Sequence, residues 1–197
     1  MVRYIVSIML LIGISGCANT ETTSFTDPAF KSERFNNFVV KVDNTDFQSK
    51  ELIANEICVE LRDAGARCTS SLNIFPPTRS YSNDEKSKIL KERNVGGYLV
   101  ILVGDGSTST NYIGSQQFGT VNVYGNYATT NTNSMPIYSF SRQAGYNSIL
   151  IDTKTQNKAW VGGSRTSGQG LVNITDDAFA SSLASSLVDA LRNNGHL

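Results

Sequence analysis

The apolar run at residues 98–103 restricts the possible folds of this chain more than any other feature. A strand with one face in water alternates apolar and polar residues, whereas every residue of this run is apolar. Such a run is typical of a central strand that is covered on both faces. We therefore expect it to lie inside a sheet whose other strands and helices come from the segments on either side.

Shorter patterns around that run predict an α/β (α+β) fold. Apolar residues at helical spacing indicate the helices, and capping residues such as Thr45 and Ser82 mark where two of them start. The expected order is β-α-β-α-β-β-β-β-α, a mixed sheet with helices packed mainly on one face. The strands are expected at residues 38–42, 66–75, 98–103, 119–127, 147–153 and 158–162, and the helices at 47–64, 83–93 and 176–194.

Residues 107–146 differ in composition from the rest of the chain. They are rich in Gly, Ser, Thr and Asn, interleaved with aromatic residues, and they predict a long hairpin with its tip at residues 129–134. Binding residues concentrate on segments presented by a rigid scaffold, and Tyr is enriched at interfaces. The hairpin is therefore the best candidate for a partner-binding surface, although its rings could instead cover a core of its own. The candidate residues are Tyr112, Phe118, Tyr124 and Tyr127.

The N-terminal segment has the parts of a secretory signal peptide. Arg3 is followed by an apolar run and then by small residues that lead to Cys17. The run is shorter than the roughly 20 apolar residues that a membrane-spanning helix needs. Ile14-Ser15-Gly16-Cys17 resembles the lipobox of bacterial lipoproteins, while the alternative is an ordinary signal peptide with a chance cysteine. The resemblance implies cleavage before Cys17, a thioether-linked diacylglycerol on its sulfur and an acylated α-amine.

Lipidation would determine where the chain resides. Two or three acyl chains hold a protein firmly on a membrane, whereas one chain binds only marginally. Ala18, rather than Asp, follows the lipidated cysteine, which in lipoproteins that follow the enteric sorting rule implies the outer membrane, with the domain in the periplasm. We expect residues 1–16 to be the signal peptide, 17–37 the lipidated Cys with a flexible tether, and 38–197 a single domain.

The charge balance argues against a nucleic-acid partner. The chain has 17 basic and 17 acidic residues, and no basic patch is evident. Cys58 and Cys68 would remain after the signal peptide is removed, and two thiols in an exported chain can form a disulfide. The loop is short, so the bond would stabilise by about 3 kcal/mol at most. A pair of buried free thiols is the alternative, because a helix and the strand after it can hold the two Cα atoms too far apart.

Few residues could support catalysis. His196 is the one histidine, and it lies near the C-terminus, where we expect a frayed end. Two cysteines without a third soft ligand do not make a zinc site. Asp43 and Asp105 follow expected strands and could be adjacent, but such residues usually cap turns. We therefore expect no enzyme activity, no metal, no small-molecule substrate and no cofactor apart from the lipid on Cys17.

The end of the chain carries a second resemblance. An apolar strand ends in Asp152, a turn follows, and the next strand contains Trp160-Val161-Gly162 before a final amphipathic helix. This pattern resembles that of outer-membrane lipoproteins of unknown function, of penicillin-binding-protein activator lipoproteins and of the periplasmic domain of the curli secretion lipoprotein. In these families Gly is usual in the turn, where this chain has Gln156-Asn157. The resemblance implies that Trp160 packs under the final helix.

Together these observations predict a non-enzymatic outer-membrane lipoprotein. It would act as an accessory or assembly factor by binding another cell-envelope protein. An activator of a peptidoglycan synthase and an oligomeric secretion-pore subunit are the alternatives.

Overall fold

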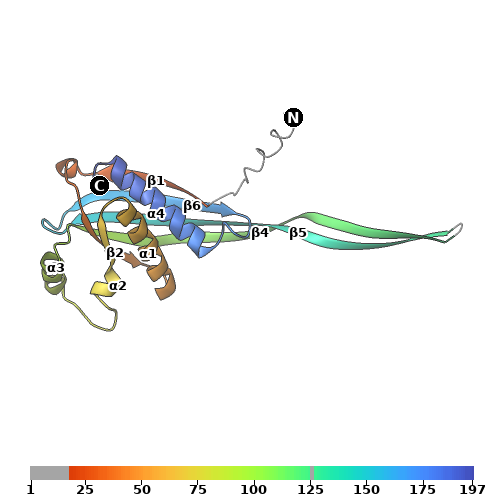
Figure 1. Cartoon of the computed structure of the whole chain (residues 1–197), viewed down its shortest axis with the longest axis horizontal. Coiled ribbons are helices and arrows are strands. Elements are labelled where there is room, and N and C mark those ends of the chain that lie inside the picture. The colour runs from red at the N-terminus through yellow and green to blue at the C-terminus, as the bar shows by residue number, and fades with distance from the viewer. Residues whose placement is uncertain (1–17, 125–126) are drawn as a thin grey trace, which may run out of the picture.

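The computed structural model describes residues 18–124 and 127–197. The strands are β1 (Asn19–Thr26), β2 (Asn37–Asp43), β3 (Arg67–Ser70), β4 (Gly97–Tyr124), β5 (Tyr127–Asp152) and β6 (Lys158–Gln169). The helices are α1 (Phe47–Asp63), α2 (Ser71–Ile74), α3 (Asn83–Glu92) and α4 (Asp176–Asn193), with a 3₁₀ turn, η1, at Pro28–Phe30. The strands form one sheet in the order β1-β6-β5-β4-β2-β3 (Figure 1). Strand β2 is parallel to β3 and β4, and the other neighbours are antiparallel, so the predicted mixed α/β sheet is confirmed.

Helices cover the two faces of this sheet unequally. Helices α1 and α4 lie side by side over one face and form the main core with residues such as Leu99 of β4 (Figure 1). On the other face, Val39 of β2 packs in a smaller cluster with Ile74 of α2 and Leu90 of α3. The start of β4 is thus covered on both faces, which confirms the expectation for residues 98–103.

The prediction of a flexible tether at residues 17–37 is wrong for much of that range, because it contains strand β1. Strand β1 pairs along β6, and its inward side chains are hydroxyls that contact α4. The hydroxyls of Thr20 and Ser182 lie 2.8 Å apart, as do those of Thr22 and Ser186. A strand that packs through hydroxyls has no hydrophobic periodicity, so the pattern that identifies strands does not detect it. The folded domain therefore begins at β1 and not at residue 38.

The order of elements differs in detail from the expected one. The observed order is β-β-α-β-α-α-β-β-β-α, with β1 as an added first strand. The strand expected at residues 66–75 ends at Ser70, whose hydroxyl accepts a hydrogen bond from the Leu72 backbone N–H and so caps α2. Strands β4 and β5 run without interruption through a region where we expected shorter strands.

The long hairpin also differs from the prediction at its base and at its tip. Gly104-Asp105-Gly106 does not end β4, because the register shifts between Val103 and Gly106 and the strand continues beyond this bulge. Residues 129–134, the expected tip, lie inside β5. Strand β4 instead ends at Tyr124 and β5 begins at Tyr127. The connection between them lies outside the described residues.

Cys58 of α1 and Cys68 of β3 form the disulfide that we considered from the sequence. Their Cα atoms are 5.1 Å apart, within the range that a disulfide can bridge. The distance is short because α1 lies directly over β2 and β3 in the core. The bond joins the C-terminal half of the helix to the edge strand of the sheet.

The C-terminus is packed, so our expectation that His196 lies in a frayed end is wrong. Its side chain is 0% exposed and lies against Phe35, with 5.8 Å between the ring centroids. Its Nδ1 lies 3.0 Å from the Glu33 carbonyl oxygen, and its Nε2 lies 3.2 Å from the Thr26 hydroxyl. The histidine thereby ties the chain end to the segment that follows β1.

Candidate functional site

Strands β4 and β5 continue beyond the core as a two-stranded projection (Figure 1). We call it the ribbon; it consists of residues 110–124 of β4 paired with residues 127–140 of β5. Strand β2 stops pairing with β4 at Leu102, and β6 stops pairing with β5 at Ser141. Within the described residues, neither outer edge of the ribbon is therefore paired with another strand. At about 3.4 Å per residue, the ribbon extends roughly 50 Å from the core.

Large apolar side chains are exposed on both faces of the ribbon. Along β5, Tyr138 lies on the same face as the core residue Tyr146, because the two are an even number of residues apart. Its partner Tyr112 shares that face, and the two ring centroids are 5.9 Å apart in an edge-on contact. Phe118 and Met135 lie on the opposite face. The exposed set is Tyr112, Ile113, Phe118, Val121, Met135, Ile137 and Tyr138.

The ribbon has few of the features that normally keep exposed strands apart. Residues 110–140 contain no Asp, Glu, Lys, Arg or His. Free strand edges usually carry charges or prolines that prevent pairing with another chain, and Pro136 is the one such residue here. A two-stranded hairpin is also only marginally stable in water by itself. These properties indicate a surface that another molecule covers.

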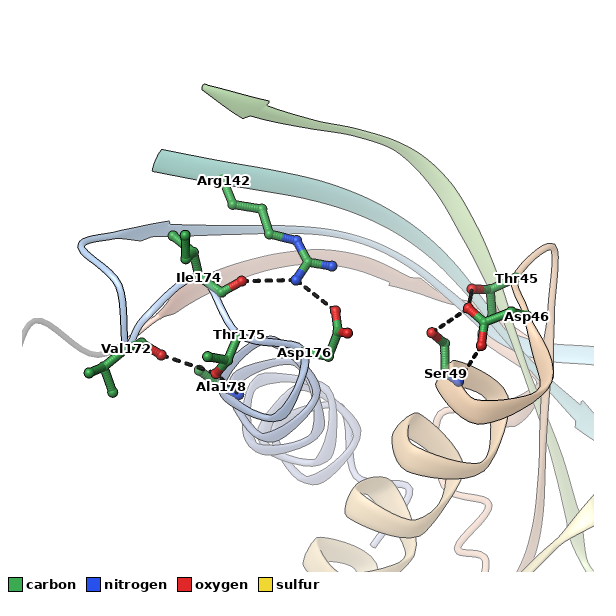
Figure 2. A network of polar contacts seen from close by, with 9 residues as sticks. All are labelled: Thr45, Asp46, Ser49, Arg142, Val172, Ile174, Thr175, Asp176 and Ala178. Carbon is green, nitrogen blue, oxygen red and sulfur yellow. Dashed lines mark hydrogen bonds and ion pairs between the residues drawn. The ribbon is translucent and has the colours of Figure 1, made fainter. Parts of the chain in front are cut away.

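Arg142 fixes the base of the ribbon to the start of α4 (Figure 2). One guanidinium nitrogen donates to the Asp176 carboxylate at 2.7 Å and to the Ile174 carbonyl at 2.9 Å. The guanidinium carbon lies 4.6 Å from the centroid of the Phe179 ring, a cation–π contact. Because α4 is packed on the core, this one side chain connects the ribbon to a rigid element.

A cavity of about 230 Å³ lies next to Arg142, between the starts of α1 and α4. Tyr146 lines it, and burial raises the pKa of the Tyr146 hydroxyl. Among the described residues that line this cavity, Arg142 and Asp176 are the charged ones, and they are paired with each other. The two charges at this cavity are therefore engaged with each other at the base of the ribbon.

Comparison with known proteins gives no family for the chain. No family model matches the sequence, and no curated protein matches it. Among solved structures, the PelC dodecamer from Paraburkholderia phytofirmans is 13% identical over 90% of this chain and 99% of that chain, with a TM-score of 0.49. Lipoprotein GNA1162 from Neisseria meningitidis is 14% identical over 80% of this chain and 98% of that chain, with a TM-score of 0.42. At these values the likenesses carry no function over to this chain.

The structure places two of the predicted binding residues on the ribbon but does not bring them side by side. Tyr112 and Phe118 are both exposed there, on opposite faces. Tyr124 and Tyr127 form the last backbone pair of the ribbon, and their side chains lie outside what the structure describes. Cys17, the predicted lipidation site, also lies outside the described residues.

Sequence reasoning missed more than half of the apolar surface. The candidates included Tyr112 and Phe118 but left out the other exposed residues of the ribbon, which are Ile113, Val121, Met135, Ile137 and Tyr138. The distribution of charged residues was a better signal for this surface, because no charged residue lies between Asp105 and Arg142. An uncharged segment of that length, with apolar residues at intervals, marks a surface that is not adapted to water.

Two of the three residues considered for catalysis have structural contacts. Asp43 is paired with Lys41 at 2.6 Å, and Asp105 lies in the bulge at the base of the ribbon. His196 is buried in contacts with the 26–35 segment. Within the described part of the chain, no cluster of three metal-ligating side chains is found. The described helices include none with the length and apolar character needed to cross a membrane.

Proposed function

We propose that this chain is a non-enzymatic, lipid-anchored accessory protein of the bacterial cell envelope, and that it binds another envelope protein through the ribbon. The observation that carries the proposal is the ribbon itself, which is uncharged and exposes apolar side chains on both faces. The anchor rests on the lipobox-like sequence that ends at Cys17. Ala18 after that cysteine favours the outer membrane, with the domain in the periplasm.

The chemistry of the ribbon favours a protein as its partner. The two free edges offer rows of backbone N–H and C=O groups, which add a strand from a partner through main-chain hydrogen bonds. The aromatic and aliphatic side chains on the faces add apolar contact area and decide which partner fits. A peptidoglycan synthase, which this protein would activate, is one class of partner with these requirements.

The test is photo-crosslinking in living cells. A photoreactive amino acid replaces Phe118 on one face of the ribbon or Tyr138 on the other. We expect one discrete adduct at one or both positions, which mass spectrometry then identifies. The same amino acid in place of Val59, an exposed position on α1, is the matched control and should give no such adduct.

The Cys17→Ala form tests the anchor in the same cells. If the partner is met at the membrane, the adduct is lost when Cys17 is replaced, and the protein leaves the membrane fraction. Absence of any adduct at both Phe118 and Tyr138, in protein that fractionates with the membrane, would contradict partner binding through the ribbon.

An oligomeric secretion-pore subunit is the second candidate, and the two unpaired edges of the ribbon favour it. The β4 edge of one copy can pair with the β5 edge of the next, and such a head-to-tail contact repeats until a ring closes. Crosslinking would then give a ladder of self-adducts in place of one foreign adduct. A monomer in mild detergent would exclude this second function.

The proposal of a non-enzymatic role is tested by the carboxylates that we considered. The ion pair between Asp43 and Lys41 supports a structural use of that aspartate. We expect Asp43→Ala and Asp105→Ala cells to keep the phenotype of the wild type. Loss of function in either variant, at an unchanged protein level, would argue for catalysis.

A further inference from the structure

The loop between β6 and α4 exposes two consecutive aliphatic side chains. Leu171 is 68% exposed and Val172 is 77% exposed, the highest values among the large apolar side chains of the described residues. The loop is separate from the ribbon in sequence and plays no part in the proposed partner binding. Two neighbouring aliphatic residues held out in water require an explanation of their own.

The exposure of these side chains is not a consequence of a loose loop. The side-chain amide of Asn173 donates to the Gln169 carbonyl at 2.9 Å, and the Thr175 hydroxyl donates to the Val172 carbonyl at 3.0 Å. The Arg142 guanidinium also donates a hydrogen bond to the Ile174 carbonyl oxygen. The backbone of the loop is therefore fixed at several points, and its apolar side chains are presented outward by a rigid support.

The described chain begins next to this loop. Ala18 and Asn19 line the same groove as Val172 and Asn173. Asn19 is paired with Ser167, close to the end of β6 from which the loop starts. The residue that precedes Ala18 in the sequence is Cys17, the predicted site of the acyl chains. Because β1 starts at Asn19, no flexible tether separates that cysteine from the folded domain.

We propose that Leu171 and Val172 form a second membrane contact, inserted into the interface of the bilayer beside the lipid anchor. The inference rests on the lipid anchor of the proposed function, since the anchor brings this end of the domain to the membrane. Aliphatic side chains gain free energy when they enter the boundary between headgroups and acyl chains, and a second signal adds to the hold of the acyl chains. The two contacts together fix which end of the domain faces the bilayer.

The experiment measures how deep the loop lies in a bilayer. Val172→Cys is labelled with an environment-sensitive fluorophore in the full lipidated protein, in which the disulfide occupies Cys58 and Cys68. The protein is reconstituted into phosphatidylethanolamine–phosphatidylglycerol vesicles that carry a nitroxide at a shallow position of the acyl chain. We expect emission shifted to shorter wavelength and quenched by the nitroxide. Val59→Cys, labelled in the same way on α1, should show neither effect.

Two further measurements make the result decisive. Leu171→Asp in the Val172→Cys background should reverse the wavelength shift while the protein stays on the vesicles. Emission at position 172 equal to that at position 59, in protein that floats with the vesicles, would overturn the membrane contact and leave the anchor intact. Mass spectrometry that finds Cys17 without acyl chains would overturn the anchor itself, and the inference with it.

Discussion

At the level of single residues, the start of α1 depends on one carboxylate. The sequence suggested a capping box beginning at Thr45, whereas the structure places the N-cap at Asp46 (Figure 2). Hydrogen bonds from the hydroxyl and then the backbone N–H of Ser49 lower the pKa of Asp46 to about 2. A pKa lower in the folded than in the unfolded state means that this cap stabilises the protein above about pH 4 and is lost as the pH falls towards 2.

The prediction concerns Asp46→Asn, which keeps a capping side chain but cannot ionise. The stability advantage of the wild type over this variant should be present at pH 6, shrink at pH 3 and vanish near the folded pKa of about 2. Urea unfolding at a series of pH values measures this difference in the free energy of unfolding between the wild type and the variant. Asp63→Asn, at the other end of the same helix, is the control and should not reproduce that loss. A wild-type advantage that is constant from pH 6 to pH 2 would show that Asp46 does not act through its charge.

Another residue-level constraint explains the Trp-x-Gly pattern in β6. Trp160 is buried in the core that α4 covers, as the resemblance implied, and a Cβ atom added to Gly162 would overlap its ring. We predict that Gly162→Ala destabilises the fold by about 1–3 kcal/mol, the usual range for overpacking a filled core. Gly163→Ala is the matched control, because the nearest atom to its Cβ would be the Thr23 hydroxyl at 3.9 Å. Equal urea midpoints for the two variants would contradict this role of Gly162.

At the level of elements, Arg142 should control the order of the ribbon more than the stability of the fold. Asp176 is largely exposed, so its ion pair with Arg142 contributes less than about 1 kcal/mol. We predict that Arg142→Gln leaves the unfolding midpoint nearly unchanged but speeds amide hydrogen exchange at residues 139–145. Arg79→Gln, in the loop before α3, is the control and should leave this exchange unaffected. Unchanged exchange in Arg142→Gln would mean that strand pairing alone holds the ribbon base.

Helices and strands could be predicted from the sequence where they bury apolar side chains, and not where they pack through polar ones. The buried stripes of α1 and α4 and the apolar start of β4 were correctly located, because burial of one face leaves a periodic pattern. Strand β1 was missed because it packs on α4 through hydroxyls. The continuity of β4 through Gly104-Asp105-Gly106 was missed because a bulge and a strand end have the same composition.

The position of the hairpin was predicted from the sequence, but its shape was not. Tyr112 and Phe118 identified the correct hairpin, because its composition differs from that of the core. The hairpin leaves the core as an uncovered pair of strands because β2 and β6 end at its base. Where those two strands end is a property of the whole sheet. The disulfide was likewise left open, since the distance between Cys58 and Cys68 is set by how α1 packs.

At the level of the whole molecule, three features meet at one end of the domain. The described chain starts there at Ala18, the Leu171–Val172 loop is exposed there, and the ribbon leaves the core there. The Gly170 backbone N–H donates to the Phe140 carbonyl at 2.9 Å, which joins the loop to the first residues of the ribbon. If the anchor holds this end at the bilayer, the ribbon starts at the membrane surface. A partner in or on the same membrane then lies within its reach of roughly 50 Å.

This arrangement predicts that the ribbon is separable from the fold. The variant removes residues 110–140 and joins Ser109 to its partner Ser141 through Asn-Gly, the preferred sequence for a two-residue hairpin turn. The ribbon adds no residue to either buried cluster, so the unfolding free energy of the core should change by less than about 1 kcal/mol. Thermal unfolding and membrane fractionation should match the wild type, whereas the cellular function should be lost. An unfolded core would mean that the ribbon stabilises the domain, and retained function would place the partner-binding surface elsewhere.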